Sequence, residues 1–205
     1  IHSDCRVAAS CVATVSERKM LWVRSISSWA PTNIGPYCQA NTMRNGEIAI
    51  AYLAGQIGLD PSTMQLVSNG GWGSELIQCV SNCKAVLNAV YDEKDKTFRV
   101  MRCVAYVSWK ECGMMDNAVP SAEISTSIRV MCRGLFSQSD LPVSIVPVPR
   151  LPRDAAVELE LITSRRSCCE SLTWRTHHLH LEASFVRRRC FVASASFSCD
   201  DDDDN

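Results

Sequence analysis

One stretch of the chain, Trp29–Pro61, constrains the fold and the candidate site more than any other; it reads WAPTNIGPYCQANTMRNGEIAIAYLAGQIGLDP. A loop rich in proline and glycine leads into an apolar run typical of a β-strand, and this run ends at Ala54-Gly55-Gln56. Glycine at a strand end lets a ligand or another backbone come close, because it has no Cβ. Tyr37 follows a proline on the stiff loop. The loop and the strand end together predict two walls of a small-molecule pocket.

Hydrophobic periodicity predicts an α+β sheet with two helices packed on one face. Both expected helices carry apolar residues at steps of three and four, which makes one apolar stripe on each. The first stripe is Leu76, Val80, Cys83, Leu87 and Val90, and the second is Ile124, Ile128, Met131 and Leu135. The expected helices are Ser74–Val90 and Ser121–Phe136, with Ser121 as an N-cap, and the expected strands are Glu47–Leu53, Thr97–Trp109, Val143–Val148 and Ala155–Ile162.

The two ends of the chain are predicted to extend a central domain at residues 29–165. Residues 1–28 predict a hairpin of Arg6–Val15 and Met20–Ile26 around a charged turn at Ser16–Lys19. Residues 166–199 are expected to form a C-terminal hairpin, whose strands are Leu179–Phe185 and Cys190–Phe197. Residues 200–205 form an acidic tail that we expect to be disordered. The chain starts at Ile1 without Met, and we expect it to be a piece of a longer protein.

Composition excludes several classes of partner. The net charge of −1 and the pI near 6.5 give no global attraction to nucleic acid or to an anionic membrane. No run approaches the ~18 apolar residues that a membrane helix needs. The chain has 12 cysteines without a CxxC pair, which argues against a metal site. Most lie in apolar runs, and free buried thiols indicate a cytoplasmic protein.

Three segments follow the order and spacing of motifs in one known family. They are GPYCQA at Gly35–Ala40, AGQIGLDP at Ala54–Pro61, and the late segment Val143–Glu160 with its Leu151-Pro152 turn. The chain therefore resembles the RidA family of reactive-intermediate deaminases, once classed as endoribonucleases. This resemblance implies a chorismate-mutase-like fold, usually a trimer with pockets between subunits. Trp29-Ala30-Pro31 and a long tail bearing histidines are similar to the second RidA-like module of plant-type diphthine–ammonia ligases.

The RidA resemblance also implies a set of site residues. Tyr37, Cys38, Gly55 and Gln56 would line the ligand pocket, with Cys38 in place of the usual serine, and Glu158 would be the catalytic carboxylate. The family places an arginine 15 residues before this glutamate, and Val143 stands there. A forked guanidinium binds a substrate carboxylate through two parallel hydrogen bonds, and valine cannot do so.

The presence of valine instead of arginine at position 143 argues against ordinary imine deamination by this chain. Arg150 lies seven residues further on, an odd offset that points its side chain to the other face of an extended strand. Arg153 is a weak candidate on a loop. Without its arginine, Glu158 is also explained as a solvated residue of a half-exposed strand, because Val157 and Leu159 alternate with it.

The leading hypothesis is a RidA-like module of a diphthine–ammonia ligase, which amidates diphthine to diphthamide on a translation elongation factor with ATP and ammonia. The module itself would be a non-catalytic scaffold, oligomerisation domain or ligand sensor. The chain lacks a Ser-Gly-Gly-x-Asp-Ser pyrophosphate loop, so we expect no cofactor on it and ATP only on a separate ligase domain. Its expected partners are further copies of the chain or an adjacent RidA-like module, a small ligand and, for the parent enzyme, the elongation factor. The alternative hypotheses are a stand-alone enamine or imine deaminase and, with little support, a ribonuclease.

Overall fold

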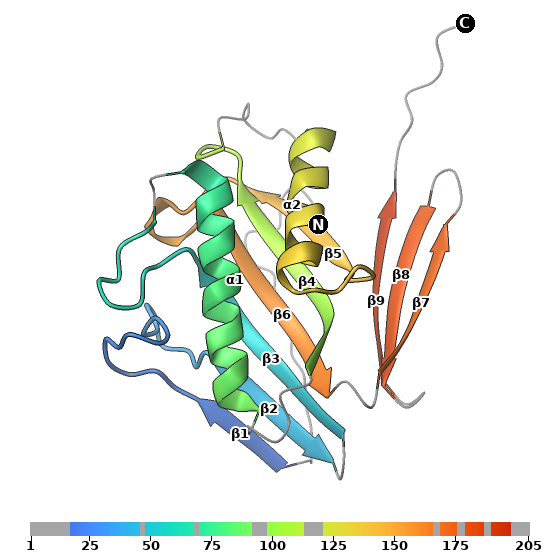
Figure 1. Ribbon diagram of the computed structural model, residues 1–205, viewed down its shortest axis with the longest axis horizontal. Coiled ribbons are helices and arrows are strands. Elements are labelled where there is room, and N and C mark those ends of the chain that lie inside the picture. The colour runs from blue at the N-terminus through green and yellow to red at the C-terminus, as the bar shows by residue number, and fades with distance from the viewer. Residues whose placement is uncertain are drawn as a thin grey trace, which may run out of the picture.

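A mixed sheet with two helices on one face forms the main body of the protein (Figure 1). The computed structural model describes residues 17–45, 48–67, 70–91, 98–112, 121–165, 169–175, 179–186 and 190–197, and beyond residue 164 it describes the backbone alone. Within these residues the predicted α+β architecture is confirmed. None of the described helices is long and apolar enough to cross a membrane.

Six strands form the main sheet in the order β1-β2-β3-β6-β4-β5. Their bounds are β1 Glu17–Leu21, β2 Ala40–Asn45, β3 Ile48–Ile57, β4 Phe98–Ser108, β5 Val143–Val148 and β6 Val157–Arg165. Neighbouring strands are antiparallel except β4 and β5. These two are parallel because helix α2, Ala122–Leu135, crosses over between them and returns the chain to the same end of the sheet. Strand β2 has no counterpart among the strands predicted from periodicity.

Helices α1, Gly71–Val90, and α2 cover the same face of the sheet (Figure 1). The stripe predicted on the first helix is the face that packs inward. Four of its members are buried and the fifth, Val90, packs at the margin of the core; the buried four are Leu76, Val80, Cys83 and Leu87. The predicted cap on α2 is also present, since the Ser121 hydroxyl accepts a hydrogen bond of 3.2 Å from the backbone N–H of Ile124. The helices therefore form where the sequence pattern placed them.

The alternation of side chains along β6 separates the core from the candidate site. Val157, Leu159 and Leu161 belong to the core between sheet and helices. Glu158 and Glu160 therefore lie on the opposite face. There the Tyr106 hydroxyl of β4 donates a hydrogen bond of 3.2 Å to Glu160. Both acidic side chains of β6 thus lie outside the apolar layer.

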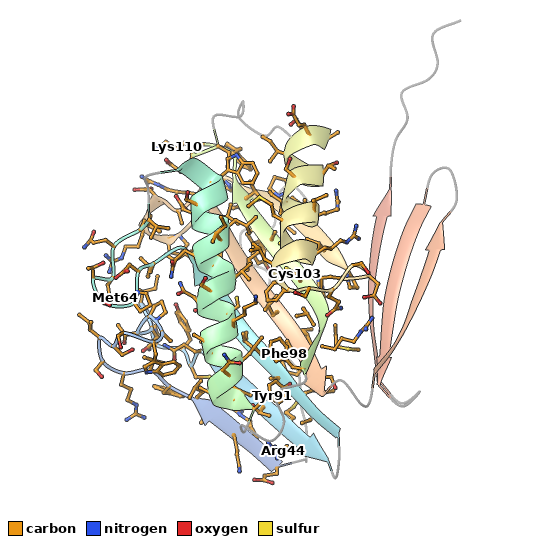
Figure 2. The ribbon with its side chains drawn as sticks, in the orientation of Figure 1. Arg44, Met64, Tyr91, Phe98, Cys103 and Lys110 are labelled. Atoms are coloured by element: carbon orange, nitrogen blue, oxygen red, sulfur yellow. The ribbon has the colours of Figure 1, made fainter. Side chains whose placement is uncertain are left out.

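The core contains free thiols and one aromatic pair (Figure 2). Tyr91 stacks on Phe98 with ring centroids 6.0 Å apart, and its hydroxyl lies 3.0 Å from the hydroxyl of Thr163. The six cysteines with described side chains are unpaired, and four of them are buried: Cys79, Cys83, Cys103 and Cys132. Burial raises the pKa of the Cys79 and Cys83 thiols, because the thiolate loses its hydration. These cysteines behave as small apolar residues.

The prediction of a charged turn at Ser16–Lys19 is wrong. Glu17, Arg18 and Lys19 lie in β1, which pairs with β2 in antiparallel register. An edge strand tolerates charged side chains, which also protect it from pairing with other chains. The other predicted strand of this hairpin, Arg6–Val15, lies outside the described residues. Strand β1 thus joins the main sheet.

The C-terminal segment forms three strands where two were predicted. Strands β8, Leu179–Val186, and β9, Cys190–Phe197, make the expected antiparallel hairpin. An additional strand β7, Cys169–Arg175, pairs with β8. Polar and apolar residues alternate over SLTWR, the last five residues of this strand, and this alternation was a usable signal for it. The acidic tail at 200–205 lies outside the described residues.

Candidate functional site

A small, partly open pocket of about 30 Å³ lies where the loop before β2 meets the ends of β3 and β6. A short 3₁₀ helix, η2 at Pro152–Asp154, adds one wall. The lining is apolar or neutral except for one carboxylate. It consists of Pro31, Thr32, Asn33, Ile34, Tyr37, Gln39, Gly55, Gln56, Ile57, Leu59, Pro152 and Glu158. The pocket therefore combines the loop and the strand end that the sequence singled out.

Glu158 lies directly against Gly55. A Cβ built on Gly55 would come within 1.6 Å of Oε1 and 2.6 Å of Cδ of Glu158. The pairing of β3 with β6 changes register between Leu53 and Gln56. An irregularity of this kind, as in a β-bulge, changes the direction of the neighbouring backbone and side chains. With Glu158 in its observed rotamer, only glycine leaves room for the carboxylate at this position. Burial, followed by the charge of Glu160, raises the pKa of Glu158 above its ordinary value.

Tyr37 is the second titratable group of the pocket. Its ring lies over the loop, where a Cβ on Gly35 would be 3.0 Å from the ring edge. Desolvation raises the pKa of Tyr37, a hydrogen bond with the backbone of Ile34 lowers it, and the negative charge of Glu158 raises it. The tyrosine therefore keeps its proton at neutral pH and can donate it in a hydrogen bond to a ligand.

Gln39 holds the loop wall in place. Its Oε1 accepts a hydrogen bond of 2.8 Å from the Val23 N–H, and its Nε2 donates to the carbonyls of Val23 and Pro31 at 3.3 and 3.2 Å. Its own backbone carbonyl accepts from Ala54 N–H at 3.0 Å. The side-chain amide of Gln39 thus holds the loop, and its backbone carbonyl ties the loop to the strand end that carries Gly55. Gln39 was part of the GPYCQA motif, but its role depends on contacts across 16 residues.

Helix α1 anchors the other side of the strand ends through two polar side chains. Asn82 donates from Nδ2 to the carbonyls of Ile57 and Leu59 at 3.1 and 2.9 Å. The buried Glu75 carboxylate accepts from the Ala156 N–H at 2.8 Å. Burial raises the pKa of Glu75, and its backbone hydrogen bonds lower it. These contacts satisfy backbone groups where regular pairing ends, and so hold the floor of the pocket rigid.

The structure brings four of the six sequence-predicted site residues into one pocket and places two elsewhere. Tyr37, Gly55, Gln56 and Glu158 line it. Cys38 is next to the pocket but does not line it, and the Asn41 Nδ2 lies 3.1 Å from its sulfur.

Val143 does not line this pocket and packs in the core. It is 5% exposed and pairs with Cys103 on the helix-covered side, whereas Glu158 pairs with Tyr106 on the other side. Residues paired across a ladder share a face, so Val143 and Glu158 point to opposite faces of the sheet. The expected lining by Val143 therefore does not occur within a single chain.

The two arginines near the site also lie outside the lining. Arg150 is exposed and forms an ion pair of 2.6 Å with Asp154. Arg153 is exposed and sits in η2 with φ of 61°. No group of three or more potential metal ligands occurs among the described residues.

The sheet, its two helices and the pocket at the strand ends define an α+β domain with one carboxylate in a largely apolar recess. The family model described as Endoribonuclease L-PSP matches residues 27–164. The chain belongs to this family, which includes the RidA proteins.

The relatives include diphthine–ammonia ligases and imine deaminases. The diphthine–ammonia ligase of Schizosaccharomyces pombe is 32% identical over 169 residues, which is 82% of this chain and 25% of the ligase. The 2-iminobutanoate/2-iminopropanoate deaminase of Mus musculus is 30% identical over 134 residues, 65% of this chain and 84% of the deaminase. The chain spans about a quarter of the length of the ligases it matches.

The fold also matches solved structures. The Rid-family protein YyfA from Yersinia pestis has a TM-score of 0.51 and is 24% identical, covering 71% of this chain and 98% of that protein. This likeness supports the fold.

Proposed function

We propose that this chain is the RidA-like module of a diphthine–ammonia ligase. We further propose that its pocket binds a small ligand without catalysing a reaction of that ligand. The observation that carries the proposal is the extent of the match. Similarity to the S. pombe ligase covers 82% of this chain, while similarity to the mouse deaminase covers 65%. The ATP-dependent amidation of diphthine would take place on a separate domain. The elongation factor would then be a partner of the whole ligase.

The described pocket supports a non-catalytic role. A deaminase that acts on an imino acid needs a cation for the substrate carboxylate, and a guanidinium suits this best. The described lining contains Glu158 but no arginine, lysine or histidine. The position that would carry the arginine is Val143, which lies in the core. We further propose that the module associates with copies of itself or with an adjacent RidA-like module.

A chimeric ligase tests the proposal. The matched segment of the S. pombe ligase is deleted in one form and replaced by this chain in another, and conversion of diphthine to diphthamide is followed by mass spectrometry of the elongation factor. We expect the deletion to lower amidation and the replacement to restore it. A replacement that stays as defective as the deletion contradicts the proposal.

One observation favours a second function, a stand-alone enamine or imine deaminase. Glu158 and Tyr37 share the pocket, and a carboxylate with a raised pKa suits general acid–base chemistry. Freshly generated 2-aminoacrylate is the substrate to assay. Turnover that is abolished in Glu158→Gln would establish deamination and overturn the non-catalytic proposal.

A further inference from the structure

A second cavity lies at the other end of strand β2 from the strand-end pocket. Its volume is about 220 Å³, whereas one water molecule needs about 10–15 Å³. Strands β1 and β2 and the last turn of α1 supply its walls, through Lys19, Leu21, Thr42, Arg44, Ala89 and Val90. Arg44 lies four residues beyond Ala40, the first residue of β2, which is about 13 Å along an extended strand. The cavity is therefore separate from the pocket around Glu158.

The polar side chains of this cavity share the helix-covered face of the sheet. Thr42 pairs with Lys19 of β1 and with Ala51 of β3. Arg44 pairs with Ala49 of β3. Both alanines belong to the core under the helices, and residues paired across a ladder point to the same face. All three polar side chains therefore point to the side on which α1 ends, and Figure 2 shows Arg44 at this end of the sheet.

The Arg44 side chain has no partner among the described residues. Its Nε is buried and donates no hydrogen bond, and none of the ion pairs between described residues includes it. Lys19 differs, because its side chain is largely exposed and lies 3.6 Å from Glu17. A buried donor without an acceptor is unfavourable, so an acceptor supplied by a ligand would be stabilised at Arg44.

The end of α1 explains the positive charge of this cavity only in part. A helix C-terminus carries partial negative charge, and α1 has no basic residue in its last turn. Arg44 and Lys19 bring two positive charges to this end. Charge compensation alone would leave Arg44 free to extend into water, whereas its Nε is enclosed beside a cavity. The described lining contains no carboxylate that this guanidinium could bind.

We propose that this cavity binds a small aliphatic carboxylate, with the carboxylate on Arg44 and the carbon chain against the end of α1. A guanidinium binds a carboxylate through two parallel hydrogen bonds, and the Lys19 ammonium and the Thr42 hydroxyl are further donors. Leu21 and Val90 give an apolar wall that suits a chain of a few carbons. The inference is independent of the function proposed above, because neither the ligase match nor the strand-end pocket enters it.

Butyrate, acetate, butylammonium and inorganic phosphate are the probes, and binding is measured by NMR chemical-shift titration of the full chain at constant ionic strength. We expect butyrate to bind more tightly than acetate, and butylammonium not to bind. Arg44→Gln should weaken butyrate by about tenfold or more, because it removes charge-assisted hydrogen bonds. Arg18→Gln is the matched control, since Arg18 lies on the opposite face of β1 and hydrogen-bonds to Asn41 at 3.0 Å. It should change the affinity less than about threefold, because an exposed charge is screened.

A second variant tests the fork geometry of the guanidinium. Arg44→Lys keeps the charge but has no fork, so it should bind butyrate more weakly than the wild type and more tightly than Arg44→Gln. Thermal unfolding verifies that each variant folds. Equal affinity of the wild type and Arg44→Gln overturns the inference, as does phosphate or butylammonium binding more tightly than butyrate.

Two acidic residues follow the lining closely in the chain, Glu47 after Arg44 and Asp92 after Val90, and both lie outside the described residues. Glu47→Gln and Asp92→Asn are therefore titrated with butyrate as well. A wild type that binds no butyrate, together with either variant that does, shows that a carboxylate of the chain itself occupies Arg44. That result overturns the proposal of a free ligand. Absence of butyrate binding in all of these proteins overturns it too.

Discussion

The close approach of Gly55 to Glu158 predicts a strong coupling between these two positions. A Cβ at residue 55 would lie 1.6 Å from Oε1, so in Gly55→Ala the carboxylate has to move by more than an ångström. Overpacking of this kind costs about 1–3 kcal/mol. Alanine is also better than glycine within a strand by about 0.5–1 kcal/mol, which offsets part of this cost. We therefore expect Gly55→Ala to destabilise the protein by up to about 2 kcal/mol.

The same substitution should have the opposite sign once the carboxylate is gone. In a Glu158→Ala background nothing remains to clash, and Gly55→Ala should stabilise by about 0.5–1 kcal/mol. The propensity gain cancels in the double-mutant cycle, so the coupling energy is the overpacking cost alone, about 1–3 kcal/mol. Urea unfolding followed by tryptophan fluorescence measures all four free energies. Gly73→Ala is the control, because a Cβ there meets nothing within 4 Å. If Gly55→Ala is equally destabilising in both backgrounds, the glycine is not there to accommodate Glu158.

Three further predictions follow from individual contacts. Asn82→Ala removes the donor to two backbone carbonyls and should cost about 1–3 kcal/mol in urea unfolding; an unchanged midpoint contradicts the proposed anchoring role. Burial raises the pKa of Glu158 above 4.5, so its destabilising effect is absent below pH 4.5 and grows until pH exceeds the raised value. Glu158→Gln should therefore be more stable than the wild type at pH 8 but equal to it near pH ~4, and a constant difference across this range would refute the assignment. In peptide-mapped thiol labelling at pH 8, Cys38 should react in the native state and the buried Cys83 only after unfolding, and early labelling of Cys83 would show that the core opens readily.

The periodic elements could be predicted because their signal is local. Strand Val143–Val148 has the predicted bounds, and both helices differ from prediction by three residues or fewer at each end. Apolar residues three and four apart place one stripe on a helix regardless of what packs against it. The predicted strand Met20–Ile26 overlaps β1 only at Met20 and Leu21. The start of β1 was placed in a turn because of its charged residues, and its strand conformation depends on pairing with β2. At an edge strand, pairing with the neighbouring strand can outweigh the intrinsic β-propensity of the residues.

The candidate site could be predicted only in part, for the same reason. Tyr37, Gly55 and Glu158 were recognisable from motifs, and the pocket contains all three. The hydrogen bonds of Gln39, Glu75 and Asn82 join segments that are far apart in the chain. A motif shows which side chains are present but not which backbone groups they satisfy.

The sequence alone determined the two helices, the strands with a regular apolar pattern and the presence of a glycine beside a tyrosine-bearing loop, since spacing and backbone freedom are properties of neighbouring residues. The tertiary structure alone decided that Val143 faces the helices while Glu158 faces the pocket. Strand order and register fix the face on which each side chain emerges, and both are settled by packing of the whole sheet. The charge of the pocket is therefore a property of the fold, because it depends on which residues the sheet brings together.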